Sequence, residues 1–234
     1  MKHINKVKVS IIFLIVGIFA NSLVLITNRS IHMNNKNDQN KINDKVLNDE
    51  LLTLVNFENM IPEDWDVNLV RLDNNQLVDQ RIYDDLLAML QTAKSEGLNL
   101  LVCSSYRTND KQAQLYLNKV NEYLKQGYSK MVASDKAAVW VARPKTSEHQ
   151  LGFAVDIVSV KNQRLDRSQE DTLESQWLMK NSWKYGFILR YPTNKSDITK
   201  VGYEPWHYRY VGKKHARKIF EMGVCLEEYL RDLD

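Results

Sequence analysis

Residues Ser147 to Asp156, with the sequence Ser-Glu-His-Gln-Leu-Gly-Phe-Ala-Val-Asp, decide the fold of this chain. From Gly152 onward, small or acidic residues at 152, 154 and 156 alternate with bulky apolar residues at 153, 155 and 157. This period of two indicates a β-strand whose apolar face enters the core. The other face carries no bulk before the carboxylate of Asp156, and we expect it to leave room for a second strand and a short peptide end. His149 precedes the strand across a glycine that permits a bend, so His149 and Asp156 could hold a metal ion together.

A second histidine motif follows about fifty residues later. His207 ends the tetrapeptide Glu-Pro-Trp-His, which begins at Glu204 and in which the proline makes the backbone rigid. Aromatic residues at 206, 208 and 210 alternate with His207 and Arg209. The aromatic side chains can therefore pack on one face of a strand while His207 points to the other, towards Asp156.

These residues form the donor set of a catalytic metal site. His149, Asp156 and His207 supply two imidazoles and one carboxylate. Three protein ligands and an open position are typical of catalytic zinc, whereas structural zinc sites are closed by four ligands and are rich in cysteine. Zinc lowers the pKa of water to about 7 and polarises a carbonyl. Glu204 is the expected base, which takes a proton from water and passes it to the leaving amine.

Each of these residues also has a plainer interpretation. His149 alone could be a hydrogen-bonded polar residue, Asp156 a cap at a strand end, and the Glu-Pro-Trp-His segment a packed turn. Taken together, however, the motifs use every histidine of the folded region except His215, which lies at a lysine-rich helix start. A carboxylate ligand and a base are already placed beside them, and this favours the metal site.

The N-terminus predicts a membrane anchor. Lys2, Lys6 and Lys8 precede an apolar run from Val9 to Ile26, which at about 1.5 Å per residue just spans a ~30 Å hydrocarbon core. The basic flank belongs on the cytoplasmic side, so the remainder should be extracellular. We expect residues 1–27 to be an uncleaved single-pass anchor, with a cleaved signal peptide as the alternative.

The remaining residues divide into a tether and one domain. Residues 28–50 are rich in Asn, Lys and Asp, and we expect a flexible polar tether there. Residues 51–234 are enough for one domain with a real core. The formal net charge of +3 is too small to indicate a nucleic-acid partner, and the sequence shows no obligate protein partner.

The domain reads as an α+β fold with a small antiparallel sheet flanked by helices, because regular βαβ alternation is absent from the sequence pattern. Helices are expected over 80–96, from 108 or 109 to 126, from Ser134 to before Pro144, from Ser168 to Tyr185, and from Lys213 onward. Strands are expected over 65–72, 98–104, 187–191 and 203–211, with a polar loop over 193–202.

The paired motifs resemble those of a known family. Ser147-x-His149-x-x-Gly152-x-Ala154-x-Asp156, followed by Glu204-x-Trp206-His207, is similar to the motifs of zinc D-alanyl-D-alanine carboxypeptidases of the VanY type, peptidase family M15B. Their wider group includes VanX dipeptidases, L-alanyl-D-glutamate peptidases and the sonic hedgehog fold. The resemblance covers roughly residues 60–225. The chain departs from many relatives at Ser105 and Lys200, where they have glycine, and both positions bear on the shape of the pocket.

The resemblance also implies the roles of individual residues. Ser104-Ser105-Tyr106-Arg107 resembles the family's Ser-x-Tyr-Arg turn, and Gln112 stands five residues after the arginine, as in the family. The implied zinc ligands are His149, Asp156 and His207; the implied catalytic residues are Glu204 and Arg107, the latter for the oxyanion or the scissile carbonyl; and the implied substrate-binding residues are Ser147, Gln112, Tyr106 and Trp206.

We therefore expect a membrane-anchored, outward-facing zinc carboxypeptidase that removes the terminal D-alanine from peptidoglycan stem peptides or their precursors. Trimming a stem that ends in D-Ala-D-Ala would remove the target of vancomycin-type antibiotics, so a contribution to glycopeptide resistance would depend on genomic context. One alternative is an L,D-carboxypeptidase that trims tetrapeptide stems. Another is a non-catalytic peptidoglycan-binding module, against which Glu204 argues because a binding site needs no proton shuttle.

Overall fold

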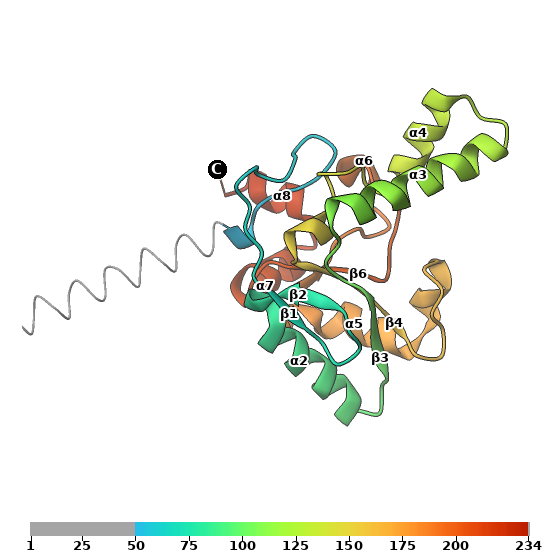
Figure 1. Cartoon of the computed structure of the whole chain (residues 1–234). Coiled ribbons are helices and arrows are strands. Elements are labelled where there is room, and N and C mark those ends of the chain that lie inside the picture. The colour runs from blue at the N-terminus through green and yellow to red at the C-terminus, as the bar shows by residue number, and fades with distance from the viewer. Residues whose placement is uncertain (1–49, 234) are drawn as a thin grey trace, which may run out of the picture. The chain divides into compact units, whose positions relative to one another are not determined.

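A four-stranded antiparallel sheet carries the candidate site in the computed structural model, which describes residues 50–233 (Figure 1). Its strands lie in the order β3-β4-β6-β5. Their bounds are Leu100–Ser104 for β3, Ala154–Ser159 for β4, Phe187–Leu189 for β5 and His207–Tyr210 for β6. A separate hairpin pairs β1, Leu69–Arg71, with β2, Leu77–Asp79. The expected α+β class with a small antiparallel sheet is confirmed.

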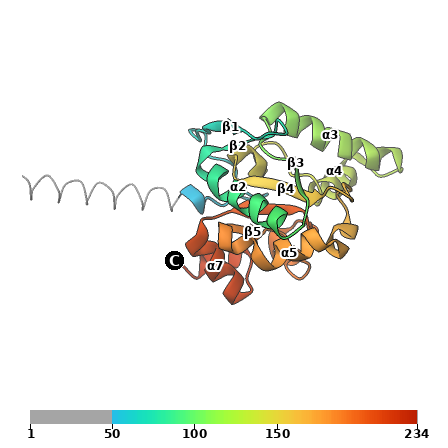
Figure 2. The same ribbon diagram turned by 90° about the horizontal axis from the view of Figure 1, so that it is seen from below.

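Helices surround this sheet. They are α2, Gln80–Ser95; α3, Asn109–Lys125; α4, Lys130–Ala138; α5, Leu173–Asn181; α6, Ser196–Thr199; α7, Lys213–Met222; and α8, Leu226–Arg231. Short 3₁₀-helices span Glu148–Leu151, Arg167–Asp171 and Ser182–Tyr185. Figures 1 and 2 show α2 and α5 on one side of the sheet, whereas the hairpin of α3 and α4 projects from the other side.

The main core lies between the sheet and the helices α2 and α5. Phe153, Val155 and Ile157 are buried there against the α2 residues Ile82 and Leu86. Because successive side chains on a strand point to opposite faces, Asp156 must point away from this core. The period of two therefore separates a hydrophobic face, which stabilises the sheet, from a face that can carry chemistry. This part of the prediction is confirmed.

The register of the sheet brings distant residues together on that second face. Asp156 in β4 lies directly opposite His207 in β6. On its other side Asp156 is paired with Ser104 in β3, after a register shift between Val102 and Ser104. Directly opposite residues of an antiparallel pair have Cβ atoms about 4.5–5.5 Å apart. The backbone ladder alone therefore brings one histidine and one carboxylate within reach of a common ion.

Two helix predictions and one loop prediction were wrong in their details. Helix α4 begins at Lys130 and is capped by the Ser129 side chain rather than by Ser134. The single helix expected from Ser168 is divided, because Thr172 has extended backbone angles and its side chain caps the separate helix α5. A short helix, α6, lies within the segment expected to be a polar loop.

The predicted anchor over residues 1–27 and the tether up to residue 49 lie outside the described residues. Among the helices that the structure does describe, none is both long and apolar enough to cross a membrane.

Gly152 is required by close packing as well as by backbone conformation. It ends the 3₁₀-helix with a φ of 79°. A Cβ at this position would lie 2.9 Å from Val67 Cγ1 and 3.0 Å from Asp79 Cβ. The lack of a side chain at Gly152 therefore makes room for Val67 and Asp79, and not for a peptide end beside the metal as we had expected. Ala154, the other small residue, lies opposite Arg209 of the neighbouring strand β6.

We predict that Gly152→Ala destabilises the domain more than Gly127→Ala does. Both glycines have positive φ, but a Cβ at Gly127 would meet nothing within 4 Å. Gly127→Ala, the control, should lower the free energy of unfolding by about 1–2 kcal/mol through backbone strain. Gly152→Ala should lower it by a further ~1–3 kcal/mol through overpacking. Urea unfolding of the two variants measures this difference. Equal losses would show that contact with Val67 and Asp79 does not constrain this position.

Candidate metal centre

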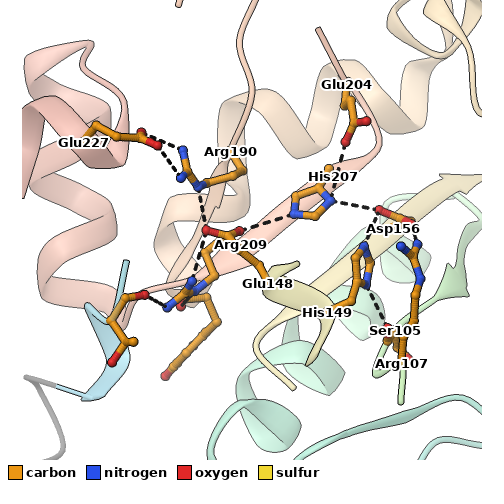
Figure 3. A network of polar contacts seen from close by, with 12 residues as sticks. Ser105, Arg107, Glu148, His149, Asp156, Arg190, Glu204, His207, Arg209 and Glu227 are labelled. Carbon is orange, nitrogen blue, oxygen red and sulfur yellow. Dashed lines mark hydrogen bonds and ion pairs between the residues drawn. The ribbon is translucent and has the colours of Figure 1, made fainter. Parts of the chain in front are cut away.

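Three ligand atoms converge on the polar face of the sheet. His149, Asp156 and His207 each offer one donor atom, and these atoms lie within 4.8 Å of one another. Asp156 Oδ1 is 3.3 Å from His149 Nε2 and 3.2 Å from His207 Nδ1. All three residues are buried, and Figure 3 shows their side chains pointing toward one another. The structure thus assembles the three predicted ligands from the 3₁₀-helix, β4 and β6.

The other polar atoms of the three side chains are occupied, which fixes the atoms left for a metal. His149 Nδ1 donates to the Ser105 carbonyl oxygen at 2.8 Å, and Asp156 Oδ2 accepts from Arg107 Nη2 at 2.7 Å. Asp156 Oδ1, in contrast, faces only the two imidazole nitrogens and makes no well-formed hydrogen bond to a described residue. A buried acceptor without a partner is costly. A cation between this oxygen and the two imidazole nitrogens would satisfy it, and the donor set suits zinc.

The protonation of two of the three residues also suits a metal. Burial and the neighbouring Arg107 lower the pKa of His149 to about 4, so its imidazole is neutral. Burial acts to raise the pKa of Asp156, but the facing His149 and Arg107 side chains hold it well below its usual range. Asp156 is therefore ionised. Metal binding requires deprotonated ligands, and these two residues already meet this condition.

His207 differs from His149 in its charge. Burial acts to lower the pKa of His207, yet its close contacts with the carboxyl groups of Asp156 and Glu148 and the charge of Glu204 raise it to about 9. The carboxyl groups of Asp156, Glu148 and Glu204 therefore surround a protonated imidazole. A metal ion that binds here must displace the proton from Nδ1, so metal binding should release a proton at neutral pH.

Glu204 lies beside the metal ligands. Its Oε2 is 3.6 Å from His207 Nδ1. The backbone holds it there, because Glu204 N donates to the Tyr191 carbonyl and the Glu204 carbonyl accepts from His207 N, both at 3.2 Å. Burial raises the pKa of Glu204 to about 8. When it is ionised, its carboxylate is consequently a stronger proton acceptor than that of an ordinary surface glutamate, which is the property a general base needs.

The cluster opens into a cavity of about 720 Å³. Arg107, Ser147, Glu204 and Trp206 line this cavity together with the three ligands. Its farther walls come from α3, from the segment after α4 and from the loop at residues 165–167. The cavity is therefore large enough for more of a peptide than its terminal residue.

Two predicted substrate-binding residues, Tyr106 and Gln112, are not among the described residues that line this cavity. Gln112 is fully buried at the start of α3, where its Nε2 donates to the Ala142 carbonyl at 2.7 Å and its Oε1 accepts from Arg107 Nη1 at 3.4 Å. The structure thus places Gln112 behind Arg107, so it would act on a substrate through the arginine.

Sequence reasoning missed three buried charged residues behind His207. Glu148, Arg190 and Arg209 are almost wholly inaccessible, and Figure 3 shows them as one network with Glu227. Charged residues are rarely buried without partners. An arginine within each of the apolar strand segments 187–191 and 206–211 was a signal that a buried carboxylate had to exist.

Comparison with known proteins agrees with a zinc site at this cluster. The family model described as "VanY: D-alanyl-D-alanine carboxypeptidase" matches residues 75–213. A D-alanyl-D-alanine carboxypeptidase of Enterococcus faecalis is 45% identical over 185 residues, which are 76% of this chain and 65% of the relative. The chain thus spans slightly less than two thirds of that relative's length.

Two of the solved structures that are similar to this chain illustrate the match. One is a variant of the vancomycin-resistance D,D-pentapeptidase VanY from a VanB-type resistance cassette, in complex with Zn(II). It is 45% identical with a TM-score of 0.71, over 77% of this chain and 99% of that one. The other is the LD-carboxypeptidase LdcB, which is 37% identical with a TM-score of 0.65, over 77% of this chain and 86% of that one.

We predict that Asp156→Asn weakens zinc binding far more than Asp166→Asn. The first change removes the charge of the central ligand, whereas Asp166 lines the cavity outside the ligand cluster. The loss at Asp156 should exceed the roughly 10–100-fold that removal of an outer hydrogen-bond partner costs. Titration with zinc in competition with a chromophoric chelator measures both affinities. Wild-type affinity in Asp156→Asn would exclude this carboxylate as a ligand.

Proposed function

Since the chain belongs to the VanY family of D-alanyl-D-alanine carboxypeptidases, we propose that it is a zinc-dependent carboxypeptidase that removes the C-terminal D-alanine from peptidoglycan stem peptides. The observation that carries the proposal is the buried cluster of His149, Asp156 and His207, with Glu204 beside it and a cavity in front of it. A site built only to bind peptide would need neither an unsatisfied ligand oxygen nor a base.

The proposed roles follow from the geometry. His149 Nε2, Asp156 Oδ1 and His207 Nδ1 would hold the ion, which when bound supplies a Lewis acid that polarises the scissile carbonyl and makes water more acidic. Glu204 takes a proton from the attacking water and gives it to the nitrogen of the leaving D-alanine. A C–O bond forms as the C–N bond breaks, so protons and atoms balance.

Arg107 has two roles in this scheme. It holds Asp156 through Oδ2 and is itself fixed by Ser104 Oγ, which accepts from Nε at 3.0 Å and from Nη2 at 2.8 Å. Its guanidinium also lines the cavity. A fixed cation there stabilises negative charge on the carbonyl oxygen in the transition state. One residue thereby couples the orientation of a ligand to the stabilisation of the reaction.

Ser147 and Trp206 complete the proposed substrate contacts. Both are buried and line the cavity beside the ligands. The serine hydroxyl can donate to the terminal carboxylate of a peptide, and the indole provides an apolar wall. Tyr106 remains a predicted contact, and Gln112 is proposed to support Arg107.

The similarity to LdcB supports a second candidate, an L,D-carboxypeptidase that trims tetrapeptide stems. The two reactions share the ligands and the base and differ in the residue on the acyl side of the scissile bond. Cavity shape, and hence residues away from the ion, must decide between them.

We further propose that residues 1–27 anchor the protein so that the catalytic domain is extracellular. The basic flank and the apolar run from Val9 to Ile26 support this. In untreated cells the protein should be found in the membrane fraction, and protease added to intact cells should digest its catalytic domain. A domain that is cytosolic and protected from protease would refute the proposal.

Loss of the terminal D-alanine would also lower susceptibility to vancomycin-type antibiotics. Deleting the gene and measuring the inhibitory concentration of such an antibiotic tests this.

We predict that pentapeptide stems ending in D-Ala-D-Ala lose one D-alanine when incubated with the zinc-loaded chain. Mass spectrometry of the products, with tetrapeptide stems in parallel, separates the two candidate activities. Preferred cleavage of the tetrapeptide would replace the D,D assignment by the L,D assignment. Cleavage of neither stem would contradict both.

We also predict that Glu204→Ala reduces turnover by about 10²–10⁴-fold, the contribution of a general base, while zinc affinity is retained because Glu204 is not a ligand. Glu221→Ala is the matched control, since Glu221 pairs with Arg217 on the exposed face of α7, and it should leave turnover unchanged. Wild-type hydrolysis by Glu204→Ala would remove this residue from the mechanism.

A further inference from the structure

Glu148 connects a metal ligand to a buried network of charges. Its side chain is wholly buried. Oε1 accepts from Arg190 Nε at 2.7 Å and from Arg209 Nη1 at 3.1 Å, while Oε2 lies 3.4 Å from His207 Nε2. Because His207 Nδ1 faces the ligand cluster, Nε2 carries the hydrogen and donates to Glu148. A partner on the second nitrogen fixes both the tautomer and the orientation of a ligating imidazole.

Both arginines are held in turn by segments at the two ends of the domain. Arg190 Nη1 and Nη2 donate to the two carboxylate oxygens of Glu227 in α8 at 2.8 and 2.7 Å. Arg209 Nη2 donates to the carbonyl oxygens of Leu51 and Thr53, both at 3.0 Å. Glu227, Leu51 and Thr53 all lie outside residues 75–213, the part matched by the family model.

We propose that Glu148 is a positioning residue for the metal ligand His207, and that the two segments flanking the family domain hold Glu148 in place through Arg190 and Arg209. The segments are Leu51–Thr53 and Glu227 of α8. The inference rests on the metal site of the proposed function. It adds that metal affinity depends on parts of the chain outside the family motifs.

The charge balance of the network explains this dependence. Two carboxylates and two guanidinium groups are buried together, so their charges cancel. Removing one partner leaves an uncompensated buried charge, which is strongly unfavourable. The guanidinium of Arg190 is planar, with its donors in a fixed fork. Its bond to Glu148 and its two bonds to Glu227 therefore fix each other's geometry.

Loss of the Glu227 carboxylate would therefore alter the orientation of the metal ligand His207. Without its carboxylate, Arg190 would keep two buried donors without acceptors and would turn to satisfy them. Glu148 Oε1 would follow the guanidinium, and Oε2 would move away from His207. The imidazole would then lose the acceptor that orients its ring.

The test compares neighbouring residues of α8 in the full-length chain. Glu227→Gln keeps the shape of the side chain but removes its charge, and we expect zinc affinity to fall at least about tenfold. Glu227→Asp retains the charge and should recover part of the affinity. Glu148→Gln removes the direct partner of His207, and its zinc affinity should fall by a factor toward the upper end of the roughly 10–100-fold range.

Glu228→Gln is the control for a merely structural effect. Glu228 pairs with Lys195 and caps the backbone N–H of Cys225, so its loss should lower the melting temperature without altering zinc affinity. Affinity is measured by chelator competition well below the melting temperatures of all variants. Unchanged zinc affinity in Glu227→Gln, or equal losses of zinc affinity in the Glu227→Gln and Glu228→Gln variants, would overturn this inference and leave the metal site standing. A wild-type chain that binds no zinc would overturn the metal site as well.

Discussion

The pairing of β4 with β6 is the constraint on which the rest of the structure depends. It sets Asp156 opposite His207 by backbone hydrogen bonds, before any side chain contributes. A shift of one residue would turn one ligand into the hydrophobic core and the neighbouring apolar residue into the site. The buried side chains of Phe153, Val155 and Ile157 oppose such a shift, so the hydrophobic core on one face guarantees the geometry on the other.

The site combines a rigid set of ligands with a costly arrangement of charges. Buried carboxylates are unfavourable unless they are paired and hydrogen-bonded. Here Arg107 satisfies one oxygen of Asp156, and Arg190 and Arg209 satisfy Glu148. The remaining oxygen of Asp156 faces the two imidazoles but has no well-formed hydrogen bond within the described part of the chain. Asp156 Oδ1 therefore matters for both stability and function. Its burial is unfavourable for folding, and a bound cation would satisfy it.

Much of the site could be predicted from the sequence because its signals are local. The alternation over residues 152–157 predicts the strand and its two faces, and the Glu-Pro-Trp-His segment predicts a metal ligand beside a general base. The network around Glu148 could not be predicted in the same way, since its partners Arg190 and Arg209 are 42 and 61 residues away. Ser129 rather than Ser134 caps α4, so that helix includes Ala133, which is buried with Ala137 beside Val120 of α3.

The most direct test of this account is a crystal structure of the zinc-loaded chain with anomalous scattering measured at the zinc edge. We expect one zinc ion bound by His149 Nε2, Asp156 Oδ1 and His207 Nδ1, with His207 Nε2 still hydrogen-bonded to Glu148. Zinc bound through His207 Nε2, or at a site that does not include Asp156, would contradict it.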